Sequence, residues 1–398
     1  MKACWSKTVS PKRDGSMTTA SENLSPRVLL FTDSDAFAGT ERHILDLACG
    51  LRARQIEVSV ACPDPSILAG HLRHEGLPHV AIQKGGIWDR AATRMLRELL
   101  VTRKIDIIHA HNGRTALSAA LAVRSAKRGQ CVATQHFIAP NHAGHRGFKK
   151  LLSSAAHRWV NRRIAAHVAI SQAVRLAAAN RGEMSADRIH LVPNGISDPT
   201  LGMRRPAAEI RAELGIAPAA PLLVCAARLE PEKNVNDLIE AMRFVTRAIP
   251  SAVCVIVGEG SQRQALEQLS RRMEVENSVK MSGFRADALS LINAADAFVL
   301  PSAAEPFGLV IVEAMALAKP VVAIRKGGPM EIVLDGQTGL LVSPADPAAL
   351  GAALVRLLAN PQEREIMGQQ ARRRFESHFT QERMAREMVQ VYRSILLT

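Results

Sequence analysis

Short apolar runs alternate with amphipathic stretches along the chain from residue 26 onward. In the first half, the strand-like runs are residues 27–33, 56–62, 79–83, 106–111, 131–136 and 167–171. Apolar residues recur at helical spacing between these runs, as in residues 40–54. Strands that are separated by helices predict βαβ units, and therefore a parallel sheet.

A second series of the same kind begins near Pro221. Its strand-like runs are residues 221–228, 252–260, 278–283, 297–302 and 320–324. Between the two series, residues 189–206 lose periodicity and contain a Pro-Asn-Gly turn, which predicts a linker with a hinge near Asn194 and Gly195. The last helical stretch, residues 380–396, follows the complete second series, so we expect it to cross back onto the first domain.

These patterns predict an α/β protein of two doubly wound, Rossmann-like domains that face a central cleft. The domains are expected to cover residues 26–195 and 196–379, with residues 380–398 packed on the first. Residues 1–25 are interpreted as a disordered leader, with Met17 as an alternative start. Because ligands bind at the carboxyl ends of strands in open parallel sheets, loops that follow strands are where functional residues are expected.

Composition narrows the class of protein. The six cysteines are scattered without metal-ligand spacing, which favours a reduced, cytoplasmic protein. The chain shows neither the apolar core of a secretory signal nor a run of about 20 apolar residues that would span a membrane.

The net charge of +14 is unevenly distributed, because residues 107–182 contain twelve Lys and Arg residues and no Asp or Glu. This charge predicts an anionic partner. An aromatic content of 4% argues against single-stranded nucleic acid, and we expect no nucleic-acid partner. Residues 145–164 have the pattern of a basic amphipathic helix, which is typical of attachment to an anionic membrane surface. The alternative is a helix that packs on the first domain and exposes its basic face to solvent.

The stretch EPFGLVIVE follows the apolar run at residues 297–302 and places two acids eight residues apart. Glu305 falls in the turn between strand and helix, whereas Glu313 lies on the helix. Gly308 allows close approach of a ligand, and free N–H groups at the helix start favour phosphate oxygens. In isolation, the two acids would more often be a helix-dipole acid and a surface acid.

Arg228 and Lys233 lie five residues apart in the loop after another strand of the same domain. Two cations there suit a diphosphate and the charge that develops when it leaves. Taken singly, each would more often be a solvated surface cation.

Four motifs occur in a fixed order: Arg228 with Lys233, VGEG at residues 257–260, GF at residues 283–284, and Glu305 with Glu313 around FGL. In this order and spacing they resemble the donor half of the retaining, nucleotide-sugar-dependent glycosyltransferases of family 4, which have the GT-B fold. The resemblance covers the chain from residue 26 onward. It implies an acceptor-binding first domain and a donor-binding second domain.

The resemblance also implies roles for individual residues. Arg228 and Lys233 would bind the donor diphosphate, Glu305 the sugar hydroxyls and Glu313 the ribose. The remaining donor-side positions would be the backbone of Phe307, Gly308 and Leu309, the loop at Phe284 and Arg285 along the nucleobase, and a glycine-rich loop at Gly39 and Thr40.

Three histidines follow strands of the first domain. His109 and His111 lie two apart, on one face of the strand that ends there. In similar enzymes the second of such a pair borders the reacting sugar, so His111 is the acceptor-side candidate, ahead of His136 and His109. Polar lining without a catalytic role is the alternative. Asp33 and Asp35 form a DxD-like pair, which we interpret as a polar turn rather than a metal site.

The predicted function is metal-independent transfer of a hexose from a nucleotide-diphosphate sugar, with UDP expected, and His111, Glu305, Arg228 and Lys233 in the catalytic roles. The acceptor is expected to be a glycan or a lipid-linked sugar of the cell envelope or an exopolysaccharide, at the inner face of the membrane. No cofactor is expected. The alternatives are a nucleotide-sugar epimerase or phosphorylase of the same fold, and a non-catalytic binding protein that retains it.

Overall fold

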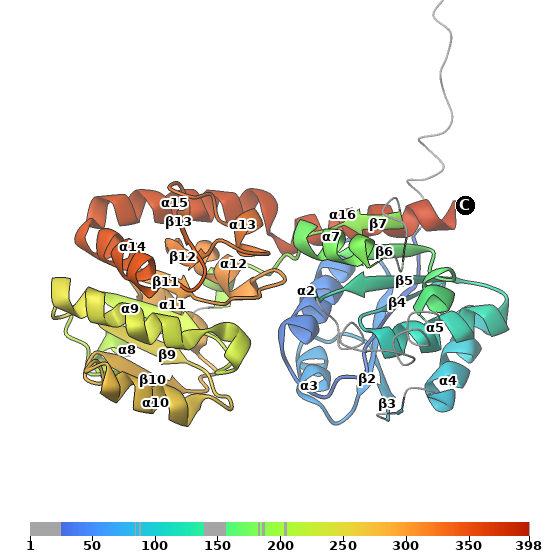
Figure 1. Ribbon diagram of the computed structural model, residues 1–398. Coiled ribbons are helices and arrows are strands. Elements are labelled where there is room, and N and C mark those ends of the chain that lie inside the picture. The colour runs from blue at the N-terminus through green and yellow to red at the C-terminus, as the bar shows by residue number, and fades with distance from the viewer. Residues whose placement is uncertain are drawn as a thin grey trace, which may run out of the picture.

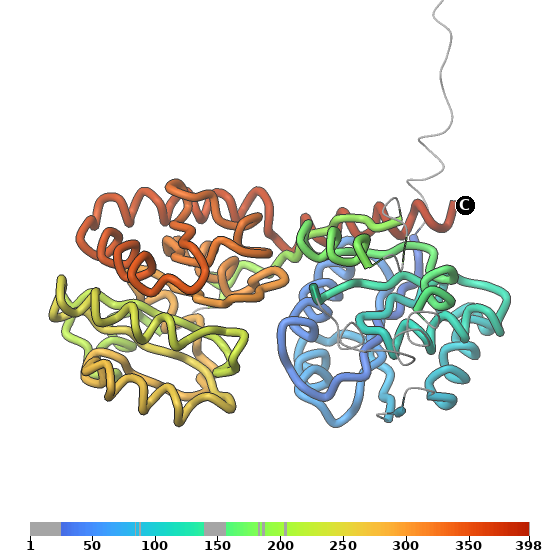
Figure 2. The backbone as a smooth tube through the Cα atoms, viewed as in Figure 1, coloured from blue at the N-terminus to red at the C-terminus, as the bar shows by residue number. Residues whose placement is uncertain are grey.

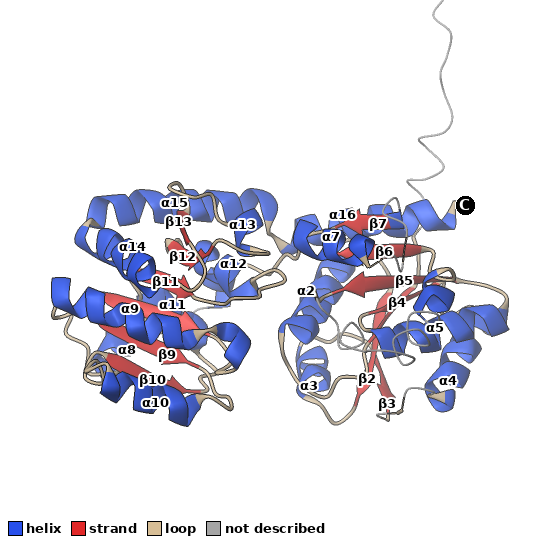
Figure 3. Ribbon diagram, viewed as in Figure 1, coloured by secondary structure: helices blue, strands red, loops and turns tan. Residues whose placement is uncertain are grey.

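The structure is a computed structural model, and it describes residues 25–83, 85–86, 89–138, 157–181, 184, 188–202 and 205–397. Residues 1–24 of the expected leader and residues 145–156 of the predicted basic helix lie outside the described residues. Two α/β halves lie side by side, each with a sheet between helices (Figure 1, Figure 3).

The first half contains a seven-stranded parallel sheet of order β3-β2-β1-β4-β5-β6-β7. Its strands are β1 (Val28–Phe31), β2 (Val58–Pro63), β3 (His79–Ile82), β4 (Ile107–Ala110), β5 (Gln130–Gln135), β6 (Ala166–Ala169) and β7 (Ile189–Leu191). Its helices are α2 (Gly39–Ala53), α3 (Ile67–His74), α4 (Arg90–Val101), α5 (Gly113–Ala126) and α7 (Gln172–Asn180). All residues of β1, β4 and β6 are buried, as expected for strands of a sheet that is covered on both faces.

The second half contains a six-stranded parallel sheet of order β10-β9-β8-β11-β12-β13. Its strands are β8 (Leu222–Ala226), β9 (Val253–Val257), β10 (Val279–Gly283), β11 (Ala297–Leu300), β12 (Val321–Ile324) and β13 (Gly339–Val342). Its helices are α8 (Ala207–Glu213), α9 (Val235–Ala248), α10 (Arg263–Arg272), α11 (Ala288–Ala294), α12 (Leu309–Ala316), α13 (Pro329–Ile332), α14 (Pro347–Ala359) and α15 (Pro361–His378), with a 3₁₀ turn η4 (Pro231–Lys233) after β8.

The last helix, α16 (Gln381–Leu396), leaves the second half and packs beside α2 of the first (Figure 1, Figure 2). Its apolar face, with Met384, Met388 and Tyr392, belongs to the core of the first half. Gly50 on α2 makes the close approach possible, because a Cβ there would lie 2.8 Å from the Cβ of Ala385. The predicted fold class is therefore confirmed, including the helix that crosses back.

The chain passes between the halves twice, and the two crossings are hydrogen-bonded to each other. The N–H of Ile196 donates to the carbonyl of Phe379 at 3.0 Å, and the N–H of Gln381 donates to the carbonyl of Ile196 at 2.9 Å. The expected hinge residue Gly195 packs so closely there that a Cβ would lie 2.1 Å from the carbonyl oxygen of Thr380. The linker and the start of α16 thus form one joint.

Two edge strands differ from the sequence-based expectation. Residues 189–191, which we assigned to the linker, form β7, and residues 339–342, which we did not assign, form β13. Strand β7 has three residues and only one of them is buried, so its apolar pattern is too short to recognise. Pairing with β6 and β12, respectively, decides both strands.

Candidate functional site

Lys233 and Glu305 form an ion pair between two neighbouring strand ends of the second half. Lys233 ends the turn that follows β8, and Glu305 lies in the loop that joins β11 to α12. The Lys233 Nζ lies 2.7 Å from a Glu305 carboxylate oxygen, and the side chains are 16% and 12% exposed. The backbone also joins the two loops, because the N–H of Ala303 donates to the carbonyl of Glu232 at 3.1 Å. The structure therefore brings together two of the four predicted catalytic residues.

The loop before α12 contains the Phe-Gly-Leu sequence at residues 307–309. Gly308 has a φ of 114°, which favours glycine, and no side chain caps the helix that starts at Leu309. Phe307 is buried and stacks edge-on against Phe379 at 6.1 Å between ring centroids. This helix start is thus open to an anion, while its aromatic neighbour fixes the loop.

A second glycine pair, which the sequence analysis did not single out, supports the same loop. The N–H of Gly328 donates to the carbonyl of Glu305 at 2.9 Å. A Cβ at Gly327 would lie 2.5 Å from that carbonyl oxygen, and a Cβ at Gly328 would lie 2.2 Å from the carbonyl oxygen of Phe307. The Gly-Gly-Pro sequence at residues 327–329 was the available signal.

Glu313 lies on α12 opposite α2 of the first half. It is half-buried, and burial raises the pKa of its carboxyl to about 7, although the positive charge of Arg42 acts to lower it. Arg42 itself pairs with Asp46 at 2.8 Å. Glu313, the predicted ribose ligand, is therefore held between the halves beside a charged pair.

The predicted glycine-rich loop also reaches this region. Gly39 begins α2, and a Cβ there would lie 3.7 Å from the Cδ1 of Leu309 at the start of α12. Thr40 is half-exposed in the first turn of α2. Gly39 and Leu309 are thus neighbours, although they come from different halves.

Arg228 does not join the pair of Lys233 and Glu305. Its side chain is 64% exposed and pairs with Glu232 at 2.8 Å. An exposed pair of this kind is worth about 0.2–1 kcal/mol, so the guanidinium can exchange Glu232 for a phosphate at little cost.

Phe284 and Arg285, predicted to lie along the nucleobase, have different environments. Phe284 is 78% exposed. The Arg285 guanidinium contacts Asp287 at 2.8 Å and Glu213 at 2.6 Å, and these carboxylates raise its pKa. Arg285 therefore links α8 to the loop after β10, which leaves Phe284 as the accessible side chain of the two.

The three predicted histidines separate into two kinds. His109, within β4, uses both ring nitrogens: one lies 2.7 Å from the Tyr392 hydroxyl of α16 and the other 2.7 Å from the Thr134 hydroxyl. His109 thus tethers the crossing helix and has no nitrogen left for a substrate.

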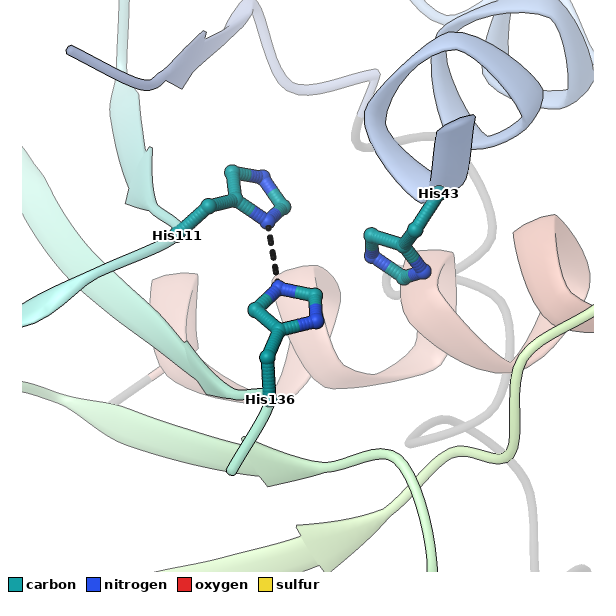
Figure 4. Close-up of side chains that lie close together, drawn as sticks. All are labelled: His43, His111 and His136. Carbon is teal, nitrogen blue, oxygen red and sulfur yellow. Dashed lines mark hydrogen bonds between the residues drawn. The ribbon is translucent and has the colours of Figure 1, made fainter. Parts of the chain in front are cut away.

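His111 and His136 follow β4 and β5 directly, and their Nδ1 and Nε2 atoms lie 3.3 Å apart. Both are buried, and burial lowers their pKa well below the usual value, so both rings are neutral. A third ring, His43 from α2, lies beside them (Figure 4). The sequence analysis missed His43 because it lies on a helix rather than at a strand end.

Contacts between the halves fix the loop of Glu305 from the other side. The Ser171 hydroxyl donates to the carbonyl of Pro306 at 2.6 Å. The carboxylate of Glu331 accepts the N–H groups of Gln172 and Ala173, at 2.7 and 2.8 Å, and thereby caps α7 from the second half. Glu331 was also missed, because a cap supplied from 159 residues away leaves no local pattern.

Asp33 has partners that fit a polar turn. Its carboxylate pairs with Arg114 at 2.8 Å and accepts the Asn112 amide at 2.7 Å. These contacts join the end of β1 to the start of α5.

The described end of the predicted basic helix is strongly positive at its surface. Arg158, Trp159, Arg162 and Arg163 line a hollow, and the Arg163 guanidinium lies 3.8 Å from the centre of the Trp159 ring. Among the helices that the structure describes, none has a stretch that is long and apolar enough to cross a bilayer.

Comparison with known proteins identifies the family to which both halves are related. The family model described as "Glycosyl transferases group 1" matches residues 206–374, and the model "Glycosyltransferase Family 4" matches residues 37–198. The chain belongs to glycosyltransferase family 4. The group 1 model thus matches the second half of the chain, and the family 4 model matches the first half.

Several relatives cover this family 4 chain to different extents. Glycogen synthase of Mycobacterium tuberculosis is 38% identical over 206 residues, which are 51% of this chain and 48% of the relative. The chain thus spans about half the length of that relative. The putative glycosyltransferase EpsD of Bacillus subtilis is 28% identical over 309 residues, or 76% of this chain and 80% of EpsD. The crystal structure of Anabaena Alr3699/HepE in complex with UDP has a TM-score of 0.80 and 25% identity, and the match covers 92% of this chain and all of the other.

Proposed function

We propose that this family 4 chain is a retaining glycosyltransferase that transfers a hexose from a nucleotide-diphosphate sugar, with UDP as the nucleotide. The observation that carries the proposal is the half-buried ion pair of Lys233 and Glu305 beside the uncapped start of α12. It places a cation, a hydroxyl acceptor and free N–H groups together at strand ends, which a sugar diphosphate requires. The UDP in the related HepE supports the choice of nucleotide.

In this proposal Lys233 and Arg228 neutralise the diphosphate, while Glu305 holds the sugar hydroxyls and Glu313 the ribose. The bond between the sugar carbon and the phosphate oxygen breaks, and the nucleoside diphosphate leaves with the electron pair. The acceptor hydroxyl attacks from the same face, and its proton passes to the departing phosphate. We expect no divalent ion in this step, because the two cations supply the charge that a metal would provide.

His111 borders the reacting sugar on the acceptor side in this proposal. Its burial keeps the imidazole neutral, so it can contribute a hydrogen bond but no positive charge. His136, 3.3 Å away, would hold the ring in place.

The proposed acceptor is a glycan or lipid-linked sugar of the cell envelope or an exopolysaccharide, at the cytoplasmic face of the membrane. Support comes from the positive surface at Arg158, Arg162 and Arg163 and from the run without carboxylates in residues 107–182. Anionic lipid attracts such a surface by about 1 kcal/mol for each basic side chain near it.

A donor panel tests the proposal. Nucleotide sugars and free nucleoside diphosphates are compared by thermal shift and by release of nucleoside diphosphate in the presence of a chelator. We expect one nucleotide to raise the Tm, and Glu305→Gln to reduce turnover with a smaller effect on binding of the free nucleoside diphosphate, because Glu305 is assigned to the sugar. Turnover that is unaffected by Glu305→Gln would contradict the assigned site.

Product analysis separates the alternatives. A transferase gives nucleoside diphosphate and a glycosylated acceptor, an epimerase returns a nucleotide sugar, and a phosphorylase requires inorganic phosphate. Stabilisation by nucleotide without any product would indicate a binding protein that retains the fold.

A further inference from the structure

A cluster of three histidines lies between α2 and the ends of β4 and β5. Within the part of the chain that the structure describes, His43, His111 and His136 form one group of potential metal ligands, in which one ring nitrogen from each residue lies within 4.8 Å of the others (Figure 4). All three side chains are buried, with 1%, 1% and 6% of their surface exposed. The glycosyl transfer proposed above uses His111 but gives no role to His43.

The spacing of the rings agrees with a metal centre of three imidazoles. Nitrogens about 2.0–2.1 Å from one zinc ion at tetrahedral angles lie about 3.3 Å apart, and their ring centroids lie about 5.2 Å apart. The observed centroid separations are 5.4 Å for His43 and His111, 5.0 Å for His43 and His136, and 5.6 Å for His111 and His136. The nitrogens of His111 and His136 are already 3.3 Å apart. Small ring rotations would direct all three toward one point.

The donor atoms are available. Both ring nitrogens of His43 are buried without a hydrogen-bond partner. The Nδ1 of His111 and the Nε2 of His136 face each other at 3.3 Å, and an ion bound between them would replace this contact. An imidazole nitrogen that is withdrawn from water and left unpaired costs free energy, which a ligand can recover. His109, the neighbour of His111 at 4.4 Å between centroids, is not available, because Tyr392 and Thr134 occupy its nitrogens.

The surroundings of His43 resemble those of a metal ligand. Ligating histidines usually donate their second ring N–H to an oxygen atom, which fixes the ring. The side chain of Asn194 lies beside His43, and its amide oxygen is itself buried without a partner. One nitrogen of His43 can therefore bind an ion while the other donates to Asn194.

We propose that His43, His111 and His136 form a binding site for one borderline-soft transition-metal ion of the Zn²⁺ type. Three neutral nitrogen ligands select Zn²⁺, Co²⁺, Ni²⁺ or Cu²⁺ over Mg²⁺ and Ca²⁺, which prefer oxygen. All three ligands belong to the first half of the chain, whereas the predicted diphosphate ligands Arg228 and Lys233 belong to the second. The ion would thus be held without any of the residues that are assigned to the diphosphate.

Cobalt absorption tests the proposal on the full chain, prepared without a histidine tag and stripped with a chelator. Titration with Co²⁺ should give the visible bands of a tetrahedral nitrogen site at one ion per chain, without a thiolate charge-transfer band, and Zn²⁺ should displace it. His43→Gln should weaken Zn²⁺ binding at least tenfold. His74→Gln, whose parent side chain is 83% exposed, is the matched control and should leave binding unchanged.

His136→Gln serves as the second ligand variant, and the Tm of each variant shows whether it folds. Absence of stoichiometric Co²⁺ binding, or equal affinity in the wild type and in a folded ligand variant, would overturn the metal site. Glycosyl transfer measured in excess chelator reports separately on the proposed function, so either proposal can fail while the other stands.

Discussion

The two halves of the molecule present different chemistry at the strand ends that face each other. The second half has charged side chains there, namely the ion pair of Lys233 and Glu305, and Gly308 precedes the start of α12. The first half offers neutral imidazoles, withdrawn from water and partly without partners. In the proposed glycosyl transfer, the second half would hold the charged diphosphate and the first half would face the neutral acceptor hydroxyl.

The difference also shows how each site is assembled. Lys233 and Glu305 each lie in a short loop directly after a strand, so their positions follow from local sequence. The histidine cluster needs α2 as well as two strands, and His43 is recognisable only after these elements pack.

The largest expected effect concerns the charged half. Lys233→Ala should lower kcat of glycosyl transfer by about 10²–10³, or about 2.7–4 kcal/mol, because it removes a preorganised charge from the leaving diphosphate. Steady-state release of nucleoside diphosphate measures this. Lys104→Ala, an exposed lysine of the first half, is the control and should behave as wild type.

The stability of the charged half should decrease as pH rises. The pKa of Glu313 is raised from 4.5 to about 7, so the folded state holds the proton more tightly than the unfolded state. This contribution, about 3 kcal/mol, is fully present below about pH 4.5 and is lost as pH rises to about 7. Urea unfolding at pH 5, 6 and 7 should show a smaller decrease in the free energy of unfolding for Glu313→Gln than for wild type. An equal decrease in wild type and Glu313→Gln would contradict the raised pKa of Glu313.

The neutral half should show the opposite sign. Burial lowers the pKa of His167 on β6 from 6.5 to about 4. Its contribution, about 3 kcal/mol, is therefore present above pH 6.5 and is lost as pH falls toward 4. His167→Gln should reduce the loss of stability between pH 6.5 and pH 4.5, as measured by urea unfolding. The exposed His74→Gln should leave the profile unchanged.

A smaller effect is expected where α16 contacts His109 in the first half. Tyr392→Phe removes the hydroxyl that contacts His109 and leaves a buried nitrogen unpaired, at a cost of about 1–3 kcal/mol. Thermal unfolding should show a lower Tm, whereas Ser394→Ala, on the same helix but exposed, should change stability by less than about 0.5 kcal/mol. An unchanged Tm for Tyr392→Phe would mean that the tether carries no stability.

The smallest effect on stability is expected at Arg228. Its exposed pair with Glu232 contributes about 0.2–1 kcal/mol, so Arg228→Ala should leave the Tm nearly unchanged. Loss of a phosphate ligand should nevertheless weaken donor binding about tenfold, or about 1.4 kcal/mol. Calorimetric titration with the nucleoside diphosphate measures this, and unaltered affinity would remove Arg228 from the predicted site.

Most of the architecture could be predicted because β-branched runs and helical spacing are local. Buried runs such as Val28–Phe31 and Leu222–Ala226 identify themselves as strands of a covered parallel sheet. Strand β7 could not be predicted, because only one of its three residues is buried, whereas β13 is a short buried apolar run that the sequence analysis did not assign. Within the site, the sequence placed Lys233 and Glu305 in loops after strands of one domain, but it predicted neither their ion pair nor the contacts of Arg285 with Asp287 and Glu213.

The sequence by itself determined two parallel α/β sheets, the crossing helix α16, and the presence of cations, acids and glycines after the strands of the second half. Only the tertiary structure decided which side chains meet. In the folded chain, His109 contacts the Tyr392 hydroxyl, and His43 lies beside His111 and His136. The Glu331 carboxylate caps α7. The physical reason is the sequence separation of the interacting residues. Periodicity and turns depend on neighbours along the chain, whereas burial, pKa values and hydrogen-bond partners depend on residues that only packing brings together.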